Sequence, residues 1–169
     1  MGFSEAVRFC FENFANFNGR AQRSQYWFWI LFSVLVGFVA GFVDSVFLGF
    51  GPDQAGLLSP LTSLALLVPS LAVTARRLHD HNRSGWWQLA PYGMAVAAVA
   101  TAWMDPPILF AAAMIAAAVL VLVLLVWMVT RGTVGDNSFG PDPLGPKRPS
   151  DPGNGRSYHS SSIPRVDPD

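Results

Sequence analysis

The sequence predicts an all-α membrane protein with four transmembrane helices arranged as two hairpins. Two observations carry this prediction. Half of the 169 residues are hydrophobic and only 13% are charged, against about 25% in an ordinary soluble domain. Four stretches without Asp, Glu, Lys or Arg cover residues 24–43, 54–75, 84–104 and 106–130, and each is long enough for a helix to cross the hydrocarbon core. A soluble four-helix bundle would carry charges along one face of each helix, so these gaps argue against it.

The chain divides into three parts. Residues 1–18 form an amphipathic segment, in which apolar side chains recur at helical spacing between positions 3 and 17. This segment is either an interfacial helix on the inner leaflet or a cap packed on the bundle. Residues 19–131 hold the four spans. Residues 132–169 are rich in Pro, Gly and Ser, and we expect a cytoplasmic tail that is disordered beyond about Leu144, because it has almost nothing to bury.

The third span is less apolar than the others. Leu89, Val96 and Val99 are its only Leu, Ile, Val or Phe residues, and it contains Pro91. A short Asp-Pro-Pro connection leads from it into the strongly apolar fourth span. We therefore expect a tight antiparallel hairpin in which neighbouring helices shield the third helix from lipid.

All 11 basic residues fall on one side of the four predicted spans. They are Arg8, Arg20, Arg23, Arg76, Arg77, Arg83, Arg131, Lys147, Arg148, Arg156 and Arg165. The two loops on the other side carry only Asp44, Asp53 and Asp105. The positive-inside rule makes the basic side cytoplasmic, so both termini are expected inside the cell. Most of the tryptophans lie near the same boundary, as amphipathic rings prefer.

Small residues recur every four positions along the first span. They are Ser33, Gly37, Gly41 and Ser45. This spacing places them on one ridge, a pattern that lets helix backbones approach closely in a membrane. We expect the ridge to face another helix, either within the chain or across a homo-oligomer.

Three segments resemble the domain of unknown function 805 family. They are residues 19–27 (GRAQRSQYW), 75–87 (ARRLHDHNRSGWW) and 136–143 (DNSFGPDP). The resemblance extends over roughly residues 9–143 and implies a polytopic protein of the bacterial inner membrane, without an established activity. The sequence departs from the family pattern at His81, where a small residue is usual, and at Ser138, where a basic residue is usual.

The candidate site lies at the cytoplasmic boundary. Its residues are Arg20, Arg23, Arg76, Arg77, His79, Asp80 and Arg83. Guanidinium groups near the free N–H groups of a helix N-terminus form a site suited to phosphate. The simpler interpretation is that the arginines only set topology and extend to headgroups. Among so many arginines, Asp80 is also suited to the role of an internal counter-ion.

Other function classes find less support in the sequence. A net charge of zero argues against nucleic-acid binding. His79-Asp80-His81 lacks the further ligands that zinc needs, and no motif of nucleophilic or metal-dependent catalysis is present. We therefore expect no cofactor, metal site or catalytic residue.

The sequence thus favours a non-enzymatic inner-membrane module whose arginine-rich face engages anionic lipid or a partner protein. Two alternatives stay open. One is a small oligomeric transporter or channel subunit, and the other is a lipid-headgroup-modifying enzyme that uses His79 and Asp80.

Overall fold

The computed structural model describes residues 1–51, 54, 56–102 and 107–145, and every regular element in these residues is helical. Five α-helices and one 3₁₀ helix follow one another along the chain. They are α1 (Phe3–Glu12), α2 (Arg23–Val46), α3 (Leu58–Asp80), η1 (Gly85–Leu89), α4 (Ala90–Thr101) and α5 (Ile108–Val129).

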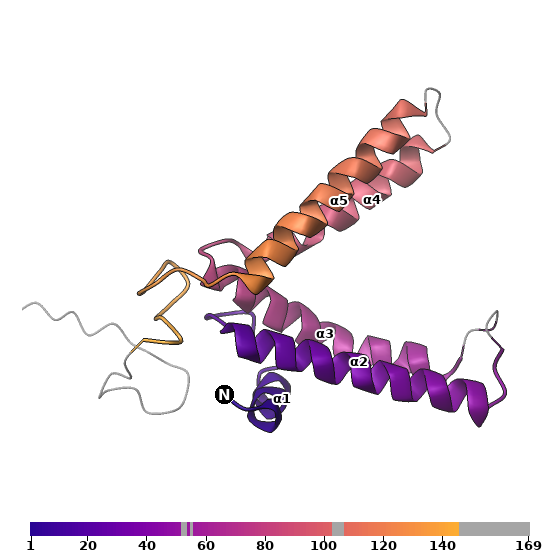
Figure 1. The fold of residues 1–169 in the computed structure, drawn as a ribbon, viewed down its shortest axis with the longest axis horizontal. Coiled ribbons are helices and arrows are strands. Elements are labelled where there is room, and N and C mark those ends of the chain that lie inside the picture. The colour runs from indigo at the N-terminus through magenta and orange to yellow at the C-terminus, as the bar shows by residue number, and fades with distance from the viewer. Residues whose placement is uncertain (52–53, 55, 103–106, 146–169) are drawn as a thin grey trace, which may run out of the picture.

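The helices form two arms that meet at one end (Figure 1). α2 and α3 run side by side in one arm, and α4 and α5 run side by side in the other. We call the meeting end the vertex; it contains the start of α2, the ends of α3 and α5, and η1. The arms diverge from the vertex, so the chain has two hairpins joined at one place.

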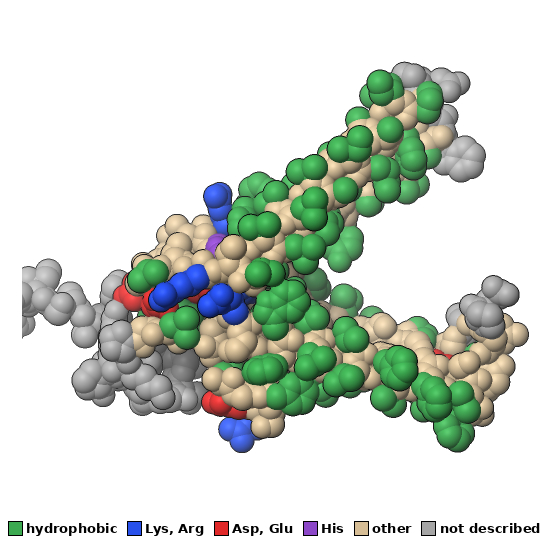
Figure 2. Space-filling view, viewed as in Figure 1, with side chains coloured by type: hydrophobic (Ala, Val, Ile, Leu, Met, Phe, Trp, Pro, Cys, Tyr) green, Lys and Arg blue, Asp and Glu red, His purple; other side chains and the backbone are tan. Residues whose placement is uncertain are grey.

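Three helices, α2, α3 and α5, are long and apolar enough to cross a membrane. Few of the side chains in their apolar stretches are buried inside the protein, and Figure 2 shows hydrophobic side chains along both arms, with most of the visible charged groups gathered near the vertex. This distribution suits helices that are surrounded by lipid. The chain is therefore a membrane protein with several spanning helices.

α3 corresponds to the predicted span 54–75 and differs from it at both ends. α3 begins at Leu58 and continues to Asp80, past Arg76 and Arg77, which follow the end of the predicted span. Arg76, Arg77 and Asp80 are all buried in this last part of α3, and their charges do not end the helix. A gap between charged residues therefore marks the apolar part of this helix but not its end.

The predicted third span, 84–104, is not one long helix. Ser84 caps the 3₁₀ turn η1 by accepting a hydrogen bond from the Trp86 N–H, and the 12-residue helix α4 follows. Pro91 lies in the first turn of α4, where the missing N–H of proline costs nothing. Residues 103 and 104 of the predicted span lie outside the described residues.

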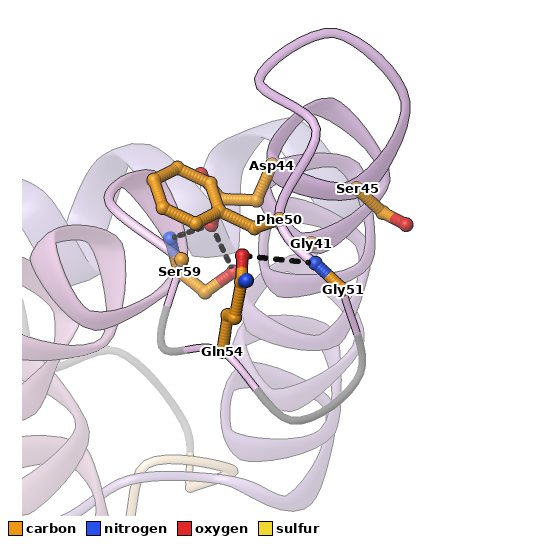
Figure 3. A pocket seen from close by; sticks show the side chains of 8 residues that line it. Gly41, Asp44, Ser45, Phe50, Gly51, Gln54 and Ser59 are labelled. Atoms are coloured by element: carbon orange, nitrogen blue, oxygen red, sulfur yellow. Dashed lines mark hydrogen bonds between the residues drawn. The ribbon is translucent and has the colours of Figure 1, made fainter.

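The carboxylate of Asp44 joins α2 to α3 at the end far from the vertex (Figure 3). Its two oxygens accept hydrogen bonds from the N–H groups of Leu57, Leu58 and Ser59, at 3.1, 2.8 and 2.8 Å, and from the Ser59 hydroxyl at 2.6 Å. These are N–H groups that a helix start leaves without an internal partner. Asp44 therefore serves as a long-range cap that fixes the α2–α3 hairpin.

The amphipathic segment is helical over a shorter range than the sequence predicts. α1 ends at Glu12, where the Asn13 side chain donates a hydrogen bond to the carbonyl of Phe9 at 3.0 Å. α1 packs against α2 through edge-to-face ring contacts of Phe3 with Phe28 and of Phe11 with Trp29. Ala6 and Cys10, both in α1, are buried.

Candidate functional site

Asp80 is the centre of the vertex. Its Oδ1 accepts hydrogen bonds from Nε and Nη2 of Arg20, at 2.9 and 2.8 Å, and its Oδ2 accepts one from Arg77. All three side chains are almost completely buried. One carboxylate therefore neutralises much of the charge of two arginines, as expected of an internal counter-ion.

Arg77 also connects the two arms. Its guanidinium donates hydrogen bonds to the carbonyls of Trp127 and Met128, at 3.2 and 3.3 Å, and to the carbonyl of Thr130. These carbonyls lie at the C-terminal end of α5, where a helix leaves acceptors without internal partners and where a cation is favourable. Arg77 thus stabilises the end of α5 from within α3.

Residues 132–142 fold back onto the end of α3. The Thr133 N–H donates to the Asp80 carbonyl at 2.8 Å, and the Asn137 side-chain amide donates to the His79 carbonyl at 2.8 Å. Arg20 reaches the carbonyls of Thr133 and Gly135, both at 2.6 Å. A Cβ atom at Gly132 would overlap the Asp80 carboxylate. The start of the predicted tail is therefore part of the vertex; residues 146–169 lie outside the described residues.

His79 is held by its neighbours on two sides. Its Nδ1 lies 3.0 Å from the Gly19 carbonyl, which can only accept, so Nδ1 carries the proton. Its ring stacks on Phe139 with a centroid separation of 4.0 Å and an interplanar angle of 7°. Through these contacts His79 connects the loop before α2, at Gly19, to the segment of residues 132–142, at Phe139.

His81 lies just beyond the end of α3, close to Arg77 and Asp80. Its Nε2 atom is buried and has no hydrogen-bond partner in the part of the chain that the structure describes. Burial, and after it the positive charge of Arg77, lowers the pKa of His81 below its usual value. The neutral imidazole is therefore the form that this position favours.

Arg76 points away from Asp80, beneath α1. Only 2% of the residue is exposed. Its Nε donates to the Ala72 carbonyl at 3.3 Å, and its guanidinium carbon lies 5.3 Å from the centre of the Phe9 ring. Nη2 has no hydrogen-bond partner among the described residues. The Cys10 thiol lies beside this guanidinium, and burial raises its pKa more than the arginine lowers it.

Three arginines at the vertex remain exposed: Arg23, Arg83 and Arg131. None of them forms an ion pair with a carboxylate of the described residues. The Arg83 guanidinium carbon lies 5.3 Å from the centre of a Trp127 ring, which itself contacts Trp87 edge to face. Stacking of this kind orients the guanidinium plane and leaves its N–H edge available.

The seven predicted site residues therefore form three groups. Arg20, Arg77, His79 and Asp80 are engaged with one another or with nearby backbone, Arg76 is buried under α1, and Arg23 and Arg83 face outward. The sequence reasoning missed the contribution of Thr133 and Asn137. The motif at residues 136–143 was a signal that this segment is folded.

The small residues of α2 lie on the side that faces α3. Ser33 and Gly37 line a hollow of about 240 Å³ together with Thr62, Ser63, Leu66, Leu67 and Ser70. Gly41 and Ser45 line a second hollow of about 230 Å³ near Asp44, shown in Figure 3. The two helices thus leave space beside the ridge instead of closing over it.

Comparison with known proteins places the chain in a family. The family model described as "Protein of unknown function (DUF805)" matches residues 14–141. Inner membrane protein YhaH of Escherichia coli K12 is 33% identical over 132 residues, which cover 78% of this chain and 90% of that protein. Inner membrane protein YhaI of the same strain is 36% identical over 132 residues, with 78% and 89% covered. No solved structure matches. The chain therefore belongs to the DUF805 family and is similar to inner membrane proteins.

Proposed function

We propose that this protein is a non-enzymatic inner-membrane module whose exposed vertex arginines bind anionic lipid headgroups at the cytoplasmic surface. The observation that carries the proposal is the division of the vertex arginines into two kinds. Arg20 and Arg77 both pair with Asp80, whereas Arg23, Arg83 and Arg131 are exposed without a carboxylate partner among the described residues. Exposed guanidinium groups bind phosphate oxygens with two parallel hydrogen bonds.

The proposal places the vertex on the cytoplasmic side, with both termini there and four spans in the membrane. The one-sided distribution of basic residues supports this orientation. For the fourth span, η1 and α4 are the support. At about 2 Å per residue in the 3₁₀ turn and about 1.5 Å in the α-helix, they reach about 28 Å, close to the hydrocarbon thickness. The exposed phenylalanines of α1 support an interfacial position for that helix.

The test is the amount of phosphatidylglycerol that the protein retains when it is purified in mild detergent, measured by native mass spectrometry. Each basic residue near an anionic membrane surface contributes about 1 kcal/mol. Arg23→Gln, Arg83→Gln and Arg131→Gln are therefore each expected to weaken binding about fivefold, and the triple variant to lose most of the bound lipid.

Arg8→Gln is the matched control, because Arg8 is also exposed but pairs with Glu12 at 3.4 Å. It should leave the bound lipid unchanged. A triple variant that retains as much phosphatidylglycerol as the wild type would contradict the proposal and leave the arginines with a role in topology alone.

A second candidate, a small oligomeric transporter or channel subunit, is favoured by one observation. Ser33, Thr62, Ser63 and Ser70, four residues that carry hydroxyl groups, line the hollow between α2 and α3. If water reaches this hollow, Ser63→Cys in a Cys10→Ala background should react with a small charged thiol reagent, whereas Phe38→Cys on an exposed face of α2 should not. Equal, low reactivity at both positions would count against transport.

The headgroup-modifying enzyme finds no such support. The carboxylate of Asp80 is occupied by Arg20 and Arg77, and His79 is stacked on Phe139.

A further inference from the structure

Arg76 is a buried cation for which the described residues supply no anionic partner. Only 2% of it is exposed, and its Nη2 has no hydrogen-bond partner there. Burial of a guanidinium is costly unless a counter-charge and hydrogen bonds compensate it. Arg76 is thus the one vertex arginine that is neither neutralised by a described carboxylate nor open to solvent.

The carboxylate on the same turn of α3 is not available to Arg76. Asp80 lies four residues further along α3, but its Oδ1 is bound by Arg20 and its Oδ2 by Arg77. Around Arg76 the structure instead places a carbonyl of its own helix, the face of Phe9 and the thiol of Cys10. Phe9 and Cys10 both belong to α1, so α1 supplies two of the groups that cover this guanidinium.

α1 is suited to leaving this position. It has ten residues, fewer than a helix needs for stability on its own in water, so its position depends on packing: the ring contacts with α2 and the burial of Cys10 against Ala21, Trp29 and Val73. Phe3 and Phe11 of α1 remain 40% and 47% exposed while the helix is docked. An amphipathic helix with such rings is stable when it lies in a membrane interface, so undocking would move α1 to another favourable position.

We propose that α1 is a lid over Arg76 and that the phosphate of an anionic membrane lipid binds this guanidinium when α1 lifts. The inference rests on the proposed function, because it needs the vertex to meet the headgroups of the inner leaflet. It adds regulation to that site: the amount of anionic lipid sets how often α1 is displaced. The phosphate supplies the counter-charge and the acceptor for Nη2.

The test uses Cys10, the single cysteine of the chain, as a native reporter of the lid. Cys10 is completely buried while α1 is docked. The full-length protein is reconstituted into phosphatidylcholine vesicles with or without phosphatidylglycerol, and alkylation by N-ethylmaleimide is followed by intact mass. We expect alkylation to be severalfold faster with phosphatidylglycerol. Equal rates in the two kinds of vesicle would overturn the proposal.

Two variants assign the effect to Arg76. Arg76→Gln should be alkylated at the same rate in both kinds of vesicle, and Arg76→Lys, which keeps the charge, should respond to phosphatidylglycerol. Arg8→Gln removes an exposed charge of α1 itself and should respond like the wild type. A response that survives in Arg76→Gln, or disappears in Arg8→Gln, would mean that the membrane attracts α1 by its own charge, and would overturn the proposal.

A further arm separates the two sources of phosphate. Inorganic phosphate added to phosphatidylcholine vesicles should not accelerate alkylation; acceleration by it but not by phosphatidylglycerol would overturn the lipid as ligand. The experiments also distinguish failure of the lid from failure of the proposed function. If Cys10 does not respond while the Arg23, Arg83 and Arg131 variants still lose bound lipid, the lid is wrong and headgroup binding stands.

Discussion

Asp80 stabilises the vertex because it compensates two buried guanidinium groups. Asp80→Asn keeps the size of the side chain but removes the charge, which leaves Arg20 and Arg77 with no carboxylate partner among the described residues. Breaking a buried ion pair from one side typically costs about 3–5 kcal/mol. We expect Asp80→Asn to lower the thermal midpoint in detergent strongly.

Glu12→Gln is the control for this variant. It breaks the exposed pair with Arg8, and exposed pairs contribute about 1 kcal/mol or less. Equal midpoints for Asp80→Asn and Glu12→Gln would show that the buried pair does not hold the vertex together.

His81 makes the stability of the vertex depend on pH. Its pKa is lowered in the folded protein, first by burial and then by Arg77, with Asp80 opposing the shift. The unfolded chain therefore takes up the proton more readily, and the contribution of His81 is present above the ordinary histidine pKa of about 6.5 and is lost as the pH falls below it. We expect the thermal midpoint to fall between pH 7.5 and pH 5.5.

The His81→Asn variant, measured under the same conditions, isolates this contribution. Its midpoint should change less over the same pH interval. A wild-type curve no steeper than that of His81→Asn would show that the proton binds equally well in the folded and unfolded chain.

At the scale of elements, the junction of η1 with α3 is tightly packed. A Cβ atom at Gly85 would lie 2.7 Å from the Cβ and 3.2 Å from the Cα of Ala75, and neither atom can rotate away. Gly85→Ala should therefore push η1 from α3, at a cost typical of overpacking, about 1–3 kcal/mol. The loss of thermal midpoint in detergent measures it.

Gly37→Ala is the matched substitution, because a Cβ atom at Gly37 meets nothing within 4 Å. It should leave the midpoint unchanged if the hollow beside the ridge is empty in the native assembly. A large loss for Gly37→Ala would indicate that a helix of a second copy occupies the hollow, as the spacing of small residues suggests.

The long helices were predictable from sequence because lipid imposes a simple requirement: long stretches without charge. Helix ends were less predictable. α3 continues through three charged residues, and two of them have partners far away in sequence: Asp80 binds Arg20, 60 residues before it, and Arg77 binds carbonyls of α5 about 50 residues after it. No local pattern reveals such partners, so the sequence placed the end of this helix five residues too early.

At the scale of the whole molecule, the sequence likewise predicts the site only in part. The sequence predicts that the arginines gather at one end, and Figure 2 shows most of the visible Lys and Arg side chains near the vertex. It did not separate those that hold the vertex together from those that remain exposed, because that division depends on how a single carboxylate, Asp80, is shared. The hydrogen bonds of Thr133 and Asn137 likewise reach residues 53 and 58 positions earlier in the chain, so no local pattern reveals them.

The most direct test of the account is the side of the membrane on which the vertex lies. In a Cys10→Ala background, Leu48→Cys, at the far end of the α2–α3 arm, and Val134→Cys, at the vertex, place exposed thiols at positions that are exposed in the native chain. An impermeant thiol reagent added outside intact cells should label Leu48→Cys, and should label Val134→Cys only after the membrane is permeabilised. Labelling of Val134→Cys in intact cells would contradict a cytoplasmic vertex, and with it the binding of inner-leaflet headgroups.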